Sequence, residues 1–282
     1  MFPSKETTGR FMTKSILCPG ARMGIFQHPV KAEDENKAGV RLFCFPYAGG
    51  GASVFRHWQV GLPSQIQVCR VQLPGRERRM QEPPHTNLVQ LVREMLDALL
   101  PCFEEKPFAF YGHSMGTRIV FETALQIRNR TGLTPVHMFM AACDAVGFPE
   151  RPPAHTLPDD HFVDVIRQLK GTPEEVLANE ELMNIFLPLL RADYRLKETY
   201  KPGETEPFAC PITAFSGADD AETCAAGMLA WSRHGNDLHL KTFNGGHFFL
   251  HTHADALLSE IGNRLTQHAP ATSRSTTIHA HL

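Results

Sequence analysis

Ser114 lies in the pentapeptide Gly112-His113-Ser114-Met115-Gly116, between a short apolar run and an amphipathic one. A strand, a G-x-S-x-G turn and a helix in this order form a nucleophile elbow. Glycine has no Cβ, so Gly112 and Gly116 let the strand and the helix approach each other, while Ser114 adopts strained backbone angles. The N–H of Met115, at the start of the helix, then faces the oxyanion that forms when a serine attacks a carbonyl. We therefore predict that Ser114 is a nucleophile and Met115 an oxyanion donor.

A serine hydroxyl needs a base to remove its proton, and the base needs a third group to orient it. In folds with such an elbow the chain order is serine, acid, histidine. His247 fits this order, because it lies in a glycine-rich loop after the last predicted strand. The acid is expected after the preceding strand, where Asp219 and Asp220 are adjacent. Position in the loop does not decide which of these two aspartates is the acid. Asp144, which follows the strand before, is a third candidate.

The loop after the first predicted strand, residues 45–51, contains three consecutive glycines. Their freedom lets a backbone N–H face the reacting carbonyl, and Ala48 is the predicted second oxyanion donor. Consecutive glycines also occur in phosphate-binding loops. Here no Lys-Ser/Thr pair follows them and no G-x-G-x-x-G is present, which argues against nucleotide binding.

The elements that must position these residues follow from the hydrophobic pattern. Strands are predicted for the apolar runs, and helices for segments with helical spacing between them. The strands are expected at 40–45, 66–71, 107–111, 136–141, 211–215 and 238–243, and the helices at 88–103, 117–125, 225–232 and 254–265. This alternation predicts an α/β fold, a mostly parallel central sheet with helices on both faces.

One interval, between Ala142 and Cys210, is too long for a single crossover and is helical in pattern. We predict that residues of about 150–205 form a helical lid insertion over the C-terminal edge of the sheet, where open α/β sheets bind ligands. Phe186 and Leu190 are its predicted substrate contacts. The alternative is a helical layer that covers no ligand.

The remaining divisions of the chain are a leader and a tail around one domain. Residues 1–38 are predicted to be a poorly ordered leader, residues 39–268 the catalytic domain, and the polar residues 269–282 a disordered tail. The 28 Lys and Arg nearly balance the 30 Asp and Glu, which argues against nucleic acid or a membrane as partner. No apolar run is long enough to span a bilayer.

The cysteine pattern bears on the compartment and on metals. The chain has seven cysteines and no C-x-x-C pair. Four of them, Cys44, Cys69, Cys102 and Cys143, lie inside apolar runs. We read these as buried thiols of a reducing cytoplasm, with no metal site, and the chain start does not resemble a secretory signal.

Six motifs in this chain together resemble those of the type II thioesterases that accompany nonribosomal peptide and polyketide synthases. They are Phe45-Pro46-Tyr47-Ala48-Gly49-Gly50, Gln72-Leu73-Pro74-Gly75-Arg76, the elbow, Leu157-Pro158-Asp159-Asp160, the run from Phe186 to Tyr194, and Gly245-Gly246-His247-Phe248. The resemblance implies an α/β-hydrolase fold with a helical lid. It implies a cofactor-free, cytoplasmic, monomeric serine hydrolase that removes acyl groups from the phosphopantetheine arm of carrier proteins.

The resemblance also bears on the open assignments. The family's acid matches Asp220 rather than Asp219, and its oxyanion donors match Ala48 and Met115. The alternatives are a medium-chain fatty acyl thioesterase, an acyltransferase or esterase for free small substrates, and a non-catalytic docking partner of a synthase. Two basic clusters are candidate contacts for an acidic carrier protein, although internal ion pairs would explain them equally: Arg76, Arg78 and Arg79, and Arg191, Arg195 and Lys197.

Overall fold

The computed structural model describes residues 26–27, 39–149 and 151–268. The predictions for the leader and the tail therefore lie outside the described residues, apart from two leader residues. These two, Phe26–Gln27, form the short strand β1.

The described residues build one seven-stranded sheet in the order β1-β3-β2-β4-β5-β6-β7. The edge strand β1 runs antiparallel to β3, and every other pair is parallel. The bounds of the parallel strands are Val40–Phe45 (β2), Ile66–Val71 (β3), Phe108–His113 (β4), His137–Ala141 (β5), Phe208–Gly217 (β6) and Gly235–Phe243 (β7). All six predicted strands are present, and the last two are longer than predicted.

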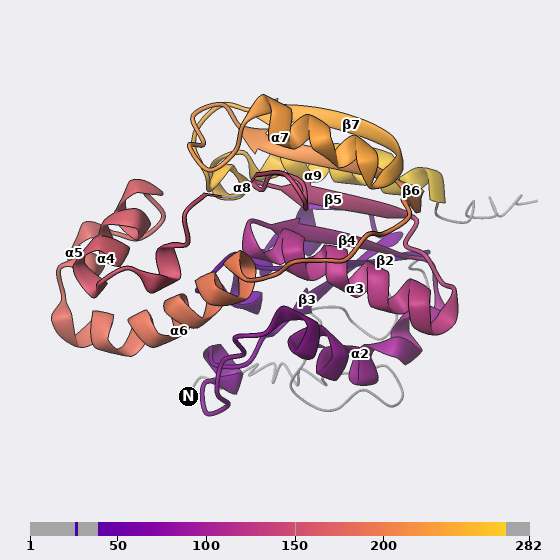
Figure 1. Ribbon diagram of the computed structural model, residues 1–282. Helices are drawn as coiled ribbons and strands as arrows, with labels where there is room; N and C mark the ends of the chain where they lie inside the picture. The colour runs from indigo at the N-terminus through magenta and orange to yellow at the C-terminus, as the bar shows by residue number, and fades with distance from the viewer. Residues whose placement is uncertain (1–25, 28–38, 150, 269–282) are drawn as a thin grey trace, which may run out of the picture.

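Helices cover both faces of the sheet (Figure 1). One face packs against α2 (Leu88–Glu105), α3 (Met115–Thr131) and the short α7 (Ala225–Leu229). The other face packs against α9 (Ala254–Leu265) and the segment around Trp58, with α8 (Phe249–Thr252) leading into α9. Because both faces are covered, β2, β3 and β4 are buried along their whole length, which explains their continuous apolar runs.

Between β5 and β6 the chain forms the helices α4 (Asp159–Gln168), α5 (Glu174–Leu177) and α6 (Glu180–Glu198). They extend beyond one end of the sheet in Figure 1 and share a small apolar cluster of their own, which includes Phe162, Met183 and Tyr194. We call residues 154–198, which include these three helices, the lid segment.

The cysteine prediction is correct for three of the four residues. Cys44, Cys69 and Cys143 are free and buried. Cys102 is disulfide-bonded, so its reading as a thiol is wrong. The apolar surroundings from which a thiol was inferred suit a disulfide equally well. In the described ranges, no helix is both long enough and apolar enough to cross a membrane.

Candidate active site

The turn between β4 and α3 has the geometry of a nucleophile elbow. Ser114 has φ 53° and ψ −113°, a conformation that side-chain-bearing residues rarely adopt. The two glycines permit the close approach that the sequence predicted. A Cβ on Gly112 would lie 2.5 Å from the backbone of Gly116, and one on Gly116 would lie 2.2 Å from the carbonyl oxygen of Phe45. The strain is held by the packing of strand against helix, which places Ser114 at the end of the sheet.

His247 and Asp220 form a buried pair beside this turn. The Nδ1 atom of His247 lies 3.0 Å from both carboxylate oxygens of Asp220, and the two side chains are 3% and 0% exposed. The backbone N–H of Glu222 donates a further hydrogen bond to Asp220. Asp219 is exposed. Of the two adjacent aspartates that the loop position left open, the structure brings Asp220 to His247.

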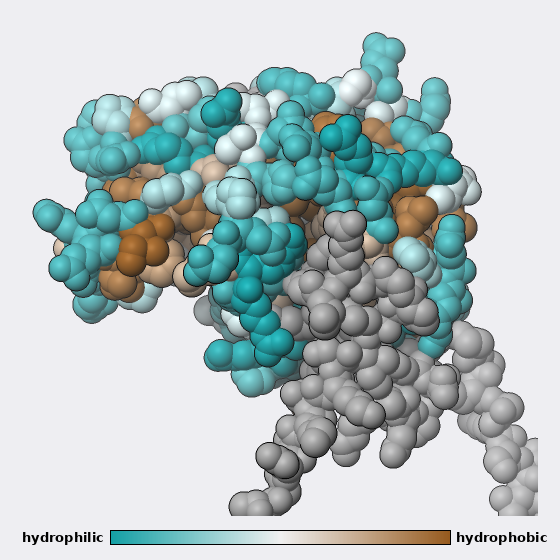
Figure 2. Space-filling view, turned by 90° about the horizontal axis from the view of Figure 1, so that it is seen from below, coloured by the Kyte–Doolittle hydropathy of each residue, from teal (hydrophilic) through white to brown (hydrophobic). Residues whose placement is uncertain are grey.

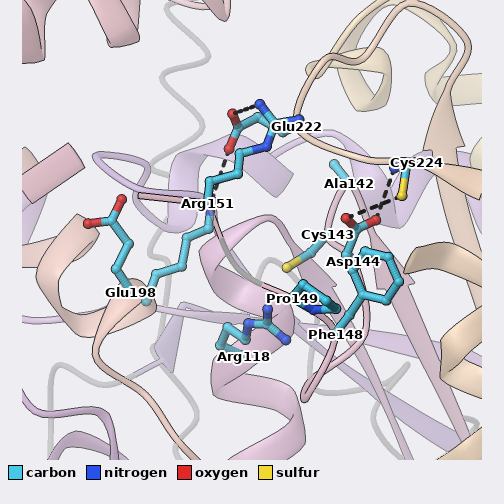
Figure 3. Close-up of a pocket in the computed structure, with 11 residues that line it drawn as sticks. Arg118, Ala142, Cys143, Asp144, Phe148, Pro149, Arg151, Glu198, Glu222 and Cys224 are labelled. Atoms are coloured by element: carbon cyan, nitrogen blue, oxygen red, sulfur yellow. Dashed lines mark hydrogen bonds and ion pairs between the residues drawn. The ribbon is translucent and has the colours of Figure 1, made fainter. Parts of the chain in front are cut away.

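The third acidic candidate faces elsewhere. Asp144 accepts a 3.0 Å hydrogen bond from the backbone N–H of Cys224 and lines a separate cavity of about 230 Å³ (Figure 3). A Cβ on Gly227 would overlap its carboxylate, so Asp144 lies tightly against the turn that begins α7. Burial raises the pKa of Asp144. In this position Asp144 holds the chain after β6 and does not orient His247.

His113 contributes a contact that the sequence alone did not reveal. It is fully buried, and its Nε2 lies 2.8 Å from the carbonyl oxygen of His247. Its Nδ1 lies 3.1 Å from the hydroxyl of Tyr111. Burial, reinforced by the nearby His247 ring, holds the pKa of His113 well below its usual range. The neutral ring therefore donates from Nε2 to His247 and accepts from Tyr111 at Nδ1.

The predicted oxyanion donors flank Ser114 from two directions. Met115 is the first residue of α3, where a backbone N–H has no acceptor within the helix. In the loop after β2, the N–H of Gly49 donates to Asp193 and that of Gly50 to the carbonyl of Tyr47. Ala48 lines the same cavity as Ser114. The donor roles of Ala48 and Met115 stay predictions.

Ser114, His247 and Ala48 line one cavity of about 60 Å³, which we call the Ser114 cavity. Its walls come from the loop after β2, the elbow, the loop after β7 and the lid segment. The lining residues from the lid segment are Ile166, Leu169, Gly171, Thr172, Leu190, Tyr194 and Lys197. Leu190 therefore remains a candidate substrate contact.

Phe186 lies elsewhere, 41% exposed on the outer side of α6. It lines an open groove of about 770 Å³ together with Ile185 and Met80. Figure 2 shows hydrophobic residues gathered at the end of the molecule that α6 occupies. The structure does not bring Phe186 to Ser114.

The basic clusters are largely engaged within the chain. Their ion pairs are Arg76–Asp193, Arg79–Glu82, Arg191–Asp159 and Lys197–Glu222. Burial alone would lower the pKa of Lys197, but the Glu222 carboxylate, together with Cys143 and Tyr194, outweighs it and the pKa is raised. Among the residues that the structure describes, no group of three or more His, Cys, Asp or Glu side chains is placed to hold a metal ion.

Comparison with known proteins identifies the family. The sequence profile of the thioesterase domain matches residues 40–265. The chain belongs to the thioesterase family. Linear gramicidin dehydrogenase LgrE of Brevibacillus parabrevis is 44% identical over 234 residues, which cover 81% of this thioesterase and 89% of that protein.

Solved structures agree with this assignment. The RedJ thioesterase from the prodiginine biosynthetic pathway of Streptomyces coelicolor superposes with a TM-score of 0.77 at 36% identity, covering 82% of this chain and 92% of RedJ. The type II thioesterase BorB from the borrelidin biosynthetic cluster gives a TM-score of 0.75 at 33% identity, covering 86% and 97%. The α/β-hydrolase fold expected from the sequence is thereby confirmed.

Proposed function

We propose that this thioesterase is a type II thioesterase that hydrolyses acyl groups from the phosphopantetheine arm of carrier proteins in a nonribosomal peptide or polyketide synthase. The observation that carries the proposal is the meeting of Ser114, the His247–Asp220 pair and the Ala48 loop around one cavity. A binding module has no need for such an arrangement. The type II assignment of BorB and the biosynthetic pathway of RedJ support the substrate class.

The proposed mechanism uses the side chains in the places described. Asp220 occupies Nδ1 of His247, which leaves Nε2 to take the proton of Ser114. The serine oxygen attacks the thioester carbonyl, and the N–H groups of Ala48 and Met115 hold the tetrahedral oxyanion. His247 returns the proton to the departing thiol, and then activates a water that cleaves the acyl-serine to the free acid. No step needs a cofactor.

The size of the Ser114 cavity favours short acyl groups. Its volume of about 60 Å³ is smaller than that of the cavity beside Asp144 and that of the outer groove, and lid side chains form much of its wall. A short acyl group makes the smaller demand on this space, and a longer one would press on the lid side chains that line it. Removal of short, stalled or misprimed units is therefore favoured over the role of a medium-chain fatty acyl thioesterase.

The name of LgrE suggests a different reaction, dehydrogenation, which this chain does not support. A nicotinamide-dependent dehydrogenase needs backbone N–H groups that face a pyrophosphate. In the glycine loop of this protein, the N–H of Gly49 and that of Gly50 are bonded to Asp193 and Tyr47. These two N–H groups are therefore not free to bind a phosphate.

The deciding experiment compares acetyl and octanoyl groups on a carrier protein with the same groups on coenzyme A and on a simple ester. We expect the acetyl carrier protein to be the best substrate, and Ser114→Ala to lose on the order of 10⁴-fold or more in kcat. A fluorophosphonate should label Ser114 in the wild type. The proposal fails if free esters are turned over faster than acyl carrier protein, or if Ser114→Ala keeps a tenth of the activity.

A further inference from the structure

We propose that Asp193 and Arg76 are positioning residues for the oxyanion hole, through which the lid helix α6 sets the loop that carries Ala48. The oxyanion loop is defined here as residues 47–50. The inference rests on the proposed function, because it assumes that Ala48 donates to the reacting oxygen. It gives a role to two sequence motifs, 72–76 and 186–194, that the triad leaves unexplained.

The contacts form one closed network. The Oδ2 atom of Asp193 accepts a 2.7 Å hydrogen bond from the backbone N–H of Gly49. Both terminal nitrogens of Arg76 donate hydrogen bonds to the same carboxylate, at 2.7 and 2.8 Å. Arg76 also donates to the carbonyl oxygen of Gly50 at 3.2 Å. The side chains of Arg76 and Asp193 are 5% and 2% exposed, so water does not compete for the ion pair.

This network fixes the peptide next to the predicted donor. Residues 47–50 form a turn closed by the bond from the Gly50 N–H to the Tyr47 carbonyl, and Gly49 has φ +77°. A positive φ at the third position is the pattern of a type II turn. The bond from Gly49 to Asp193 holds the plane of the peptide that follows Ala48. The Ala48 N–H lies in the preceding peptide, whose carbonyl, that of Tyr47, is held by the turn bond from Gly50. The turn and α6 therefore fix the two peptides on either side of Ala48, and α6 contributes the second of these restraints.

Stability alone does not explain a buried ion pair at this place. Taking two charges out of water offsets most of their attraction, and well-packed apolar residues often replace such a pair at no loss of stability. What apolar residues cannot replace is the acceptor for the Gly49 N–H. The arrangement therefore supplies geometry to the oxyanion loop, which a hydrophobic contact would leave free to rotate.

The same helix also shapes the space for the acyl group. Leu190 and Tyr194, on either side of Asp193 along α6, line the Ser114 cavity. Leu190 lies so close to the loop that a Cβ on Gly49 would be 2.7 Å from its Cδ2. An acyl group that displaces α6 therefore also displaces the oxyanion loop. Long chains are consequently disfavoured in kcat and not only in binding.

The test uses a variant designed to keep the fold. Arg76→Met combined with Asp193→Leu removes the ion pair and the Gly49 acceptor but fills the same buried space. Removing one oxyanion donor outright costs about 10²–10³-fold in kcat. A donor that is only misdirected should cost part of this, so we expect kcat to fall roughly 10- to 100-fold. KM should stay within about threefold, since substrate binding does not use the pair.

The matched control is Glu198→Gln. Glu198 is also on α6 and also accepts backbone hydrogen bonds, but from Ala154 and His155 within the lid segment. Its kcat should stay close to that of the wild type. Circular dichroism and thermal melting verify that each variant is folded.

Three results decide the inference. A folded double variant with wild-type kcat overturns it, and so does a control that loses as much kcat as the double variant. Labelling of Ser114 by a fluorophosphonate depends on the oxyanion hole but needs no carrier protein. The rate of labelling therefore measures the state of the oxyanion hole separately from acyl-carrier hydrolysis. If the wild type is labelled but hydrolyses no acyl carrier protein, the proposed function fails. Slower labelling of the double variant still supports the positioning role in that case.

Discussion

Replacing His113 with phenylalanine removes the donor that holds the main chain of His247. The two rings have similar size, and the site is walled by Phe248 and Phe249, so packing changes little. What changes is that the carbonyl of His247 and the hydroxyl of Tyr111 lose their partner. Both groups lie in residues that are almost fully buried, so water cannot replace the imidazole.

The magnitude follows from those two orphaned groups. Each buried polar group without a partner costs about 1–3 kcal/mol, which gives roughly 2–6 kcal/mol in the free energy of unfolding for His113→Phe. For a domain of this size, Tm falls by about 2–4 °C per kcal/mol, so a drop of roughly 4–24 °C is expected. The loosened His247 should lower kcat by about 10- to 100-fold, because misplacing a catalytic group by 1 Å can cost that much.

A double-mutant cycle tests the reasoning. Adding Tyr111→Phe to His113→Phe removes one of the two orphaned groups, so the double variant should be more stable than His113→Phe alone. Its kcat should not recover, because the carbonyl of His247 still lacks a donor. Urea unfolding and kcat on an acetyl thioester provide the two readouts. If the second substitution lowers stability further by its own single-variant amount, the two residues are ordinary core and the explanation is wrong.

Three more predictions follow from the described residues. Asp220→Asn should lower kcat by roughly 10⁴-fold and the exposed Asp219→Asn by less than about twofold, measured on one thioester. Leu190→Ala should raise octanoyl over acetyl turnover on the order of tenfold, whereas Phe186→Ala, outside the Ser114 cavity, should leave the ratio unchanged. Burial lowers the pKa of His137 to about 3, so the stability this neutral ring contributes is complete above pH 6.5 and declines by about 1.4 kcal/mol per pH unit toward pH 3. Urea titrations at several pH values should show a shallower decline for His137→Asn.

The elements that build this fold could be predicted because each carries a local signal. A buried parallel strand such as β2 reads as an unbroken apolar run, and an amphipathic helix such as α2 shows helical spacing. The elbow at Ser114 depends on two glycines and a serine that are adjacent in sequence. Features of this kind depend on residues that are close together in the sequence, so a short stretch of sequence is enough to predict them.

The contacts between segments that are distant in the sequence could not be predicted from such local patterns. Asp219 and Asp220 are neighbours with the same side chain, and only the packed turn after β6 decides which one reaches His247. Phe186 and Leu190 are four residues apart on α6, the spacing of one helical face. The helix nevertheless passes across the rim of the site, so that Leu190 lines the Ser114 cavity while Phe186 lines the outer groove.

The most consequential contact of this kind joins residues 117 positions apart. Arg76 follows β3 and Asp193 lies on α6, and each is an ordinary charged residue in its own segment. The fold brings them together beneath the oxyanion loop because β3 and β2 are neighbours and the lid segment returns over the same end of the sheet. The proposed nucleophile and base follow strands of the sheet, whereas the peptide after the predicted oxyanion donor is held by Asp193 of the lid segment. Under the inference drawn above, an acyl group that displaces α6 also disturbs the oxyanion loop, because Asp193 on α6 holds the Gly49 N–H.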